Sequence, residues 1–392
     1  MFRFGKSKNK KKNQEPQHPT VKLEKNHGLH NLGQNILCSK PEITNPESLQ
    51  IDEEQHETLR FANTTKQHVY LTFKIENDDG KLDMKATPER ILLKKNMSTN
   101  IEFVYSLACT VDYTGGILVC AVDEKNKGKV NVNVPVPLKI KSVESRRLDP
   151  DKLVESNRIE TTPISEIYKG LFGKKEVIIR KMKLLKDKDK DEDEKEAIKC
   201  YYQMVENMSK FKSSFIFNTE YCVLMRDKLW LIDELYEFGS LDKIINEQSS
   251  EFLSEKMKMK LLLDVTKAVM YLHKKDVIVS SISTDNVMLM STEDHVKVNA
   301  KLRDAGNRRF INLYVNKGND GNKAKTAGYF PPETYKTTAP NTPLSFAFDI
   351  YSLAVVATEI LTWQFCYPEI LYPSFWDVRE FIENNKIGRA HV

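Results

Sequence analysis

Residues 268–286 read AVMYLHKKDVIVSSISTDN, and this stretch decides the fold of the second half of the chain. It carries Tyr271-Leu272-His273 and then the pair Asp285-Asn286. Further short motifs lie on both sides of it. They are, in chain order, Ile167-Tyr168-Lys169-Gly170, Val177-Ile178-Ile179-Arg180, Gly239-Ser240-Leu241, Asp304-Ala305-Gly306, Pro331-Pro332-Glu333 and Asp349-Ile350-Tyr351-Ser352. Each motif alone is a weak signal, but the ordered set is specific for one fold.

In order and spacing, these motifs resemble those of protein kinases of the tyrosine-kinase-like branch. The resemblance implies an α+β bilobal protein-kinase-like fold over residues 147–386, with ATP and Mg²⁺ as the cofactors of its cleft. The long helix of the large lobe is expected to end near Thr362, and the later helices of that lobe are expected to be absent. Residues 387–392 (IGRAHV) read like a translated sequencing adapter, so a non-native tail is expected there.

The nucleotide cleft departs from the kinase pattern at several positions that the resemblance assigns to it. These positions are Glu160, Thr162, Ser165, Ile178, Asp233 and Leu235. Glu160, Thr162 and Ser165 stand where the family has the glycines of G-x-G-x-x-G, so side chains would occupy the space meant for phosphates. Ile178 replaces the small alanine that lies over adenine, and its extra methylenes would clash with the base. Asp233 takes the gatekeeper position, where burying a carboxylate without a partner is costly.

The catalytic loop shows the most consequential change. Residues 279–286 (VSSISTDN) stand where the family reads H-R-D-L-K-P-x-N. Ser281 therefore takes the position of the general base, and a serine hydroxyl cannot accept the proton at neutral pH. Ser280 replaces the arginine that pairs with a phosphorylated activation loop. Ser283 replaces the lysine that steadies the transferred phosphoryl group.

The positions that grip phosphates and metal are only partly kept. Arg180 stands at the strand-three lysine position, and its planar fork differs in shape from an ammonium group. The glutamate that would pair with it falls on Met204, so the ion pair of the active arrangement is missing. Asn286 and Asp304 keep the two metal-ligand positions, but oxygen ligands bind Mg²⁺ only weakly without substrate phosphates. We therefore expect the binding of ATP and Mg²⁺ to be weak or absent.

These losses favour a catalytically impaired, protein-kinase-like signalling protein. Such a pseudokinase would act as a scaffold or an allosteric partner of other proteins. The alternative is an active protein kinase, specific for Ser/Thr or for Tyr, that transfers phosphate from ATP with atypical residues. In that case Arg180, Ser281 and Asp304 would stand at the catalytic positions.

Residues 36–146 consist of short apolar segments separated by turn signals. Val69-Tyr70-Leu71-Thr72-Phe73 and Ile101-Glu102-Phe103-Val104-Tyr105 are strand-like, and Asp78-Asp79-Gly80 is typical of a turn. Several such segments without a helical period predict a β-sandwich. Phe61-Ala62-Asn63 and Pro88 match points of the immunoglobulin-like sandwich related to the major sperm protein family. That resemblance implies a binding or spacer module.

Residues 1–35 are polar and rich in lysine and asparagine, and are predicted to be disordered. Their basic part, residues 1–13, could contact an anionic membrane surface peripherally, although a solvated arm is the commoner use of such a tail. The formal net charge is +5, and the charge run at 186–196 is too short and too balanced to predict nucleic-acid binding. Without a bilayer-length apolar run or a secretory signal, a cytoplasmic protein is expected.

Overall fold

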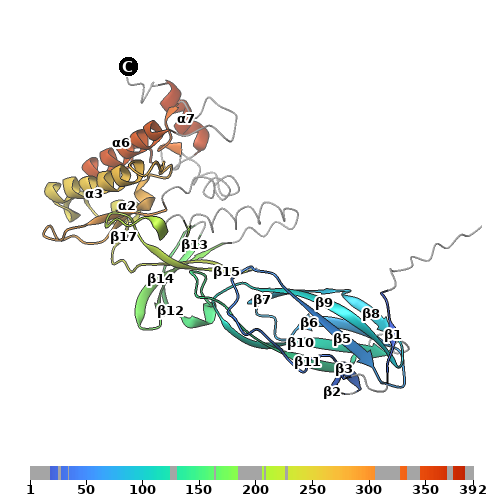
Figure 1. The fold of residues 1–392 in the computed structure, drawn as a ribbon. Coiled ribbons are helices and arrows are strands. Elements are labelled where there is room, and N and C mark those ends of the chain that lie inside the picture. Colours follow the sequence, from blue (N-terminus) through green and yellow to red (C-terminus); the bar gives the residue numbers. More distant parts are fainter. Residues whose placement is uncertain are drawn as a thin grey trace, which may run out of the picture. The chain divides into compact units, whose positions relative to one another are not determined.

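The chain divides into two compact units, Met1–Ser145 and Arg146–Val392 (Figure 1). The computed structural model describes residues 18–24, 28–33, 35–123, 130–162, 165–183, 205–206, 209–225, 228–304, 327–332, 345–368 and 374–384. The basic tail at 1–13 and the final residues 387–392 lie outside these ranges, so both predictions made for them stay predictions. Within the described ranges, no helix is long and apolar enough to cross a membrane.

The first unit is built from strands in two sheets. The first sheet has the order β1-β9-β5-β3-β2, with β7 also paired to β9, and the second has the order β4-β11-β10-β6-β8. The strands of the first sheet are β1 (Val21–Lys22), β2 (His30–Gly33), β3 (Ile36–Cys38), β5 (Gln55–Asn63), β7 (Leu82–Thr87) and β9 (Met97–Leu107). Those of the second are β4 (Ile43–Thr44), β6 (Val69–Ile75), β8 (Arg90–Leu93), β10 (Asp112–Asp123) and β11 (Val130–Lys141).

Alternating side chains from both sheets meet in one apolar core. The rings of Phe61, Phe73 and Phe103 contact one another, with centroids between 5.2 and 6.2 Å apart. Phe61 and Phe103 come from the first sheet and Phe73 from the second, so these contacts join the two layers. The all-β prediction for this part of the chain is therefore confirmed, and its physical basis is the period-two burial of strand residues.

The predicted disorder of residues 1–35 is wrong where β1 and β2 form. Val21 pairs with Ser98 of β9, and His30 pairs with Cys38 of β3. A polar segment can extend a sheet edge because the hydrogen bonds of the ladder come from the backbone. Composition alone therefore misjudged these two short strands.

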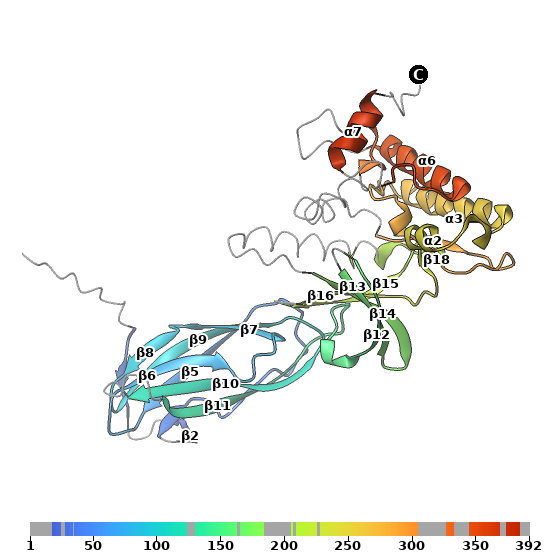
Figure 2. The same ribbon diagram turned by 180° about the vertical axis from the view of Figure 1, so that it is seen from behind.

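The second unit begins with a turn of 3₁₀ helix, η1 (Pro150–Lys152), and a five-stranded sheet that we call the small lobe (Figure 2). Its order is β12-β13-β14-β16-β15. The strands are β12 (Leu153–Thr161), β13 (Ser165–Phe172), β14 (Lys175–Met182), β15 (Thr219–Met225) and β16 (Lys228–Asp233). In the register of β14 with β16, Ile178 lies opposite Asp233 and Arg180 opposite Leu231. Ile178, Arg180 and Asp233 therefore share one face of the sheet.

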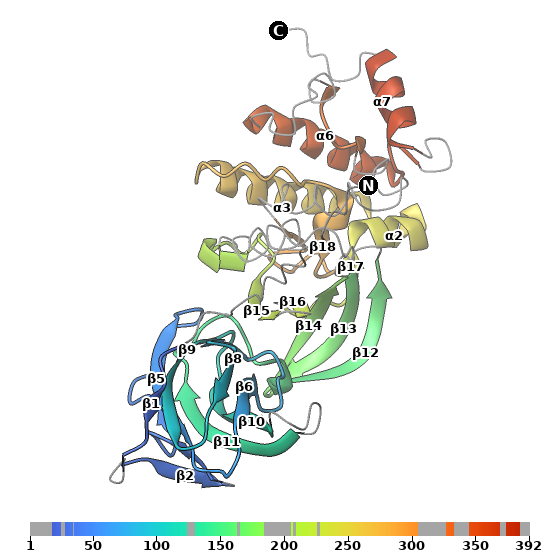
Figure 3. The ribbon, with the colours of Figure 1, turned by 90° about the vertical axis from the view of Figure 1, so that its right-hand side faces the viewer.

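The remaining elements form the large lobe (Figure 3). They are β17 (Gly239–Ser240), α2 (Leu241–Glu247), η2 (Ser250–Phe252), α3 (Glu255–His273), η3 (Thr284–Asn286), β18 (Val287–Leu289), β19 (Ala300–Leu302), α6 (Phe346–Thr362) and α7 (Phe375–Asn384). Helix α3 begins after Ser254, whose side chain accepts a hydrogen bond from the Met257 N–H. Its buried side chains recur every three or four residues and pack into the same core as those of α6.

Helix α6 ends at Thr362, as expected, but the prediction that the later helices of the large lobe are absent is wrong for one helix. Helix α7 lies beyond it, and its Val378 and Ile382 are buried in one cluster with Ala327. These two residues are four positions apart, so a short helix brings them onto one face. This packing supplies the stability that a segment of ten residues lacks on its own.

Candidate functional site

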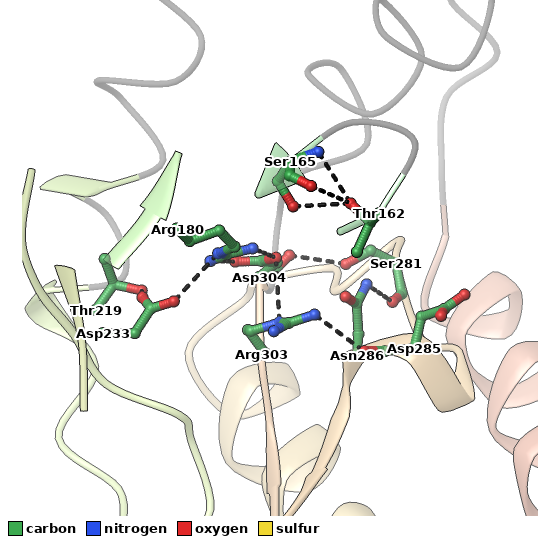
Figure 4. A network of polar contacts seen from close by, with 10 residues as sticks. All are labelled: Thr162, Ser165, Arg180, Thr219, Asp233, Ser281, Asp285, Asn286, Arg303 and Asp304. Carbon is green, nitrogen blue, oxygen red and sulfur yellow. Dashed lines mark hydrogen bonds and ion pairs between the residues drawn. The ribbon is translucent and has the colours of Figure 1, made fainter. Parts of the chain in front are cut away.

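Arg180 lies at the centre of the candidate site (Figure 4). It comes from β14, is buried, and donates hydrogen bonds to two carboxylates. Nη1 donates to Oδ2 of Asp304 at 2.6 Å, and Nη2 donates to Oδ1 of the same carboxylate at 2.9 Å. Nε donates to Oδ2 of Asp233 at 3.1 Å. A lysine ammonium could not reproduce this geometry, because only the planar guanidinium binds a carboxylate with two parallel bonds.

The two carboxylates around Arg180 have pKa values that move in opposite directions. Burial raises the pKa of Asp233 above its usual value, although the charge of Arg180 opposes that effect. Burial also disfavours the charged form of Asp304, but the charge and hydrogen bonds of Arg180 outweigh it and lower the pKa. Thr219 Oγ1 donates to Oδ1 of Asp233 at 2.6 Å, which supplies a partner for the buried gatekeeper carboxylate.

The two expected metal ligands are held by protein groups. Arg180 takes both oxygens of Asp304, and Asn286 donates its Nδ2 to the Ser281 carbonyl at 2.8 Å. Nε of Arg303 lies 3.6 Å from Oδ2 of Asp304 and brings a second positive charge to that carboxylate. Two guanidinium groups so close to the carboxylate repel a divalent cation. In this arrangement the residues do not fit Mg²⁺.

Ser281, at the expected position of the general base, has a buried side chain that is used inside the protein. Its hydroxyl contacts the carbonyl oxygens of Asp304, at 2.8 Å, and of Val279, at 3.2 Å. The hydroxyl therefore links its loop to Asp304, which lies two residues beyond the end of β19. It offers no carboxylate that could take a proton from an acceptor hydroxyl.

Asp349 of α6 holds the loop that carries Ser281 through hydrogen bonds to its backbone. This fully buried carboxylate accepts the backbone N–H groups of Val279 and Ser280, both at 2.7 Å. Nε2 of His273 lies 2.8 Å from the same carboxylate. The loop thus keeps a fixed shape through contacts that do not depend on the residues of the reaction.

Ile178, at the position expected to lie over adenine, belongs to a buried apolar cluster. Ile178 is completely buried in a cluster with Ile167, Phe217, Tyr236 and Met288. Ile167 and Ile178 belong to the small-lobe sheet, whereas Met288 lies in β18 of the large lobe. The two lobes therefore meet through direct apolar contact in this cluster.

Two residues of the loop expected to cover the phosphates, Thr162 and Ser165, form hydrogen bonds with each other. Thr162 Oγ1 lies 2.8 Å from Ser165 Oγ and accepts the Ser165 N–H at 2.9 Å, and the Thr162 N–H donates to the Ser165 carbonyl. Lys183 Nζ donates to the Thr162 carbonyl at 2.7 Å. Glu160 lies in β12 opposite Ile167. Leu235 is more than one-third exposed and contributes little to the buried cluster.

Lys181, the neighbour of Arg180, cannot replace it. Its ammonium lies over the rings of Tyr168 and Trp230 and forms an ion pair with Glu155. These groups lie on the opposite face of the sheet from Arg180, as the alternation of strand residues predicts. Two residues named in the kinase pattern, Met204 and Glu333, lie outside the described residues.

Sequence reasoning missed two residues of this site, Thr219 and Arg303. Thr219 belongs to no motif, and only the pairing of β15 with β16 brings it beside Asp233. Arg303 directly precedes Asp304 in the chain, so its charge could have been noticed there. Nη2 of Arg303 also donates to the Asp285 carbonyl at 3.1 Å, and this hydrogen bond helps to hold the Arg303 side chain in place.

A second buried polar cluster surrounds Glu359 of α6. Tyr329 donates its hydroxyl to Oε2 of Glu359 at 2.7 Å, and Oε1 accepts the Cys366 N–H at 3.2 Å. Burial raises the pKa of Glu359 from the usual 4.5 to about 7, even though these hydrogen bonds oppose it. Between about pH 4.5 and 7, this carboxyl group is therefore protonated in the folded domain and ionised in the unfolded chain.

From this shift we predict a pH dependence of stability. Because the pKa of Glu359 is higher in the folded domain than in the unfolded chain, this residue stabilises the fold fully below about pH 4.5. Its contribution to the unfolding free energy is lost as the pH rises through about 7. Glu359→Gln should remove this dependence, so the difference in unfolding free energy between wild type and variant should change by about 2 kcal/mol between pH 5 and 8. Urea unfolding at several pH values measures it. Parallel curves for the two proteins would contradict the prediction.

Comparisons with known proteins agree with the motifs in the second unit. Residues 155–386 match the family model described as protein tyrosine and serine/threonine kinase. The probable serine/threonine-protein kinase gdt9 of Dictyostelium discoideum is 23% identical over 387 residues, which cover 91% of this chain and 22% of the relative. The probable serine/threonine-protein kinase gdt2 of the same organism is 23% identical over 346 residues, covering 84% and 19%.

A further relative is described as inactive. The inactive serine/threonine-protein kinase TEX14 of Mus musculus is 31% identical over 145 residues, which cover 35% of this chain and 9% of the relative. The chain spans about a fifth of the length of the Dictyostelium relatives it matches.

Proposed function

This chain belongs to the protein tyrosine and serine/threonine kinase family, and we propose that its kinase-like domain has lost phosphoryl transfer and serves as a pseudokinase scaffold or allosteric partner. The observation that carries this proposal is the double hydrogen bond from Arg180 to Asp304. Phosphoryl transfer depends on positioned charges that hold the metal and orient the acceptor hydroxyl. Here the carboxylate that would hold the metal is neutralised by a side chain of the protein.

Two further observations support the loss of chemistry. A serine stands at the base position, and the hydroxyl of this Ser281 contacts backbone carbonyl groups. Ile178 fills the position expected for adenine with a buried apolar side chain. Restoring activity would require changes at several separate positions, so binding of ATP and Mg²⁺ is proposed to be weak or absent. Protein partners are the proposed ligands, and the two-sheet first unit, proposed to be immunoglobulin-like, would serve as a binding or spacer module.

The alternative is an active kinase with atypical residues. It is favoured by the survival of Asn286 and Asp304 and by the relatives described as probable serine/threonine-protein kinases. In that case Arg180 would have to release Asp304 when nucleotide and metal enter.

A phosphoryl-transfer assay decides between the two. The full chain is incubated with radiolabelled ATP and Mg²⁺, with and without a general protein acceptor, beside the matched variant Asp304→Asn. We expect equal, background incorporation in both proteins, because Asp304 is already engaged. Incorporation by the wild type that disappears in Asp304→Asn would overturn the proposal.

A further inference from the structure

The two lobes of the second unit are joined by contacts within the chain. The backbone before β15 pairs with β19, because Leu302 N–H donates to the Phe215 carbonyl and Phe217 N–H donates to the Leu302 carbonyl, both at 2.9 Å. Beside this pairing, Lys301 forms an ion pair with Glu234 at 2.6 Å. These contacts join the small lobe to the large lobe, and the apolar cluster around Ile178 also contains residues of both lobes.

The pair of Arg180 with Asp304 crosses the same junction at a buried position (Figure 4). It links β14, which is flanked by strands on both sides, to Asp304, which lies two residues beyond the end of β19. The side chains of Arg180 and Asp304 are 7% and 9% exposed, against 19% and 20% for Lys301 and Glu234. Solvent and salt therefore weaken the Arg180 pair much less than the Lys301 pair.

The positive charge of Arg180 also compensates the charges of two carboxylates at the junction. Asp233 of the small lobe and Asp304 of the large lobe both accept hydrogen bonds from its guanidinium. Without that cation, two buried carboxylates from different lobes would share one site and repel each other. One arginine thus satisfies two groups that would otherwise push the lobes apart.

We propose that Arg180 is a built-in clamp that holds the two lobes together in place of a bound ligand. The inference rests on the proposed function, because it takes the nucleotide position as unused. It adds a statement about regulation: the arrangement of the lobes, and the surface that the domain offers to protein partners, does not respond to ATP and Mg²⁺. A partner that binds the domain would find one lobe arrangement at any nucleotide concentration.

Hydrogen exchange of the full chain, followed by mass spectrometry, tests the clamp. We expect ATP with Mg²⁺ to leave the exchange of residues 177–182 and 279–286 unchanged in the wild type. Asp304→Asn should accelerate exchange in both segments by about tenfold, because the charged half of the clamp is lost. The matched control Lys301→Met breaks the more exposed ion pair across the same junction and should change exchange by about twofold at most. Peptides from β5 and β9 of the first unit serve as an internal standard.

Two results would overturn the clamp: protection of both segments by ATP with Mg²⁺, or wild-type exchange in Asp304→Asn. If Asp304→Asn also loses protection throughout α3, it has unfolded, and Arg180→Lys takes its place. That variant keeps the charge without the fork and should accelerate exchange in the same two segments, so wild-type exchange there would also reject the clamp. The transfer assay remains separate: protection by ATP without phosphoryl transfer would reject the clamp and the proposed weak nucleotide binding, but it would leave the proposed loss of phosphoryl transfer standing.

Discussion

Replacing Arg180 by methionine is expected to lower the unfolding free energy of the second unit by about 3–5 kcal/mol. Methionine has a similar length but no charge, so Asp233 and Asp304 would remain buried without their common partner. The cost comes mainly from these two buried carboxylates, which would keep, among the described residues, only Thr219 and the more distant Arg303 as partners, rather than from the loss of the ion pair itself. Urea unfolding at neutral pH, monitored by the fluorescence of the tryptophans, measures the effect.

The matched control for this experiment is Lys181→Met. Lys181 is the next residue of the same strand, and its ion pair with Glu155 is partly exposed. Its loss should cost no more than about 1 kcal/mol. Adding Asp304→Asn to Arg180→Met should recover part of the stability, because one uncompensated charge is removed. Equal destabilisation by Arg180→Met and Lys181→Met would contradict the role given to the buried network.

Ile178→Ala is expected to have the second large effect, a loss of about 2–4 kcal/mol. The side chain is completely buried in the cluster with Ile167 and Met288, so its removal leaves a cavity between the lobes. If this cavity is the position expected for adenine, adenosine should stabilise the variant and leave the wild type unaffected. Thermal unfolding with and without adenosine measures both effects, and omitting phosphates keeps the charged part of the site out of the test.

Ile179→Ala is the control, because Ile179 is equally buried on the same strand but points to the opposite face. It should be destabilised to a similar extent and gain nothing from adenosine. Stabilisation of the wild type by adenosine would show that Ile178 does not fill the position. A response of Ile179→Ala equal to that of Ile178→Ala would show that adenosine acts elsewhere.

The sequence predicted most of the second unit because its motifs are short and ordered. A motif such as residues 279–286 shows which residue stands at each position of the loop, because a short motif can be aligned without knowing any long-range contact. Strand alternation likewise predicted that Arg180 and Lys181 point to opposite faces. The failures, β1, β2 and α7, are short elements whose formation depends on partners elsewhere. A strand of two residues or a helix of ten is unstable alone, so its own sequence carries little signal.

The sequence by itself determined that the chain has a kinase pattern, and that pattern puts Ser281 at the expected base position and an arginine at the expected strand-three lysine position. Only the tertiary structure decided what that arginine does. Its partners Asp233 and Asp304 lie 53 and 124 residues away along the chain, and the register of the sheet and the packing of the lobes bring them together. A buried ion pair depends on distance and burial in space, and local periodicity encodes neither for residues so far apart.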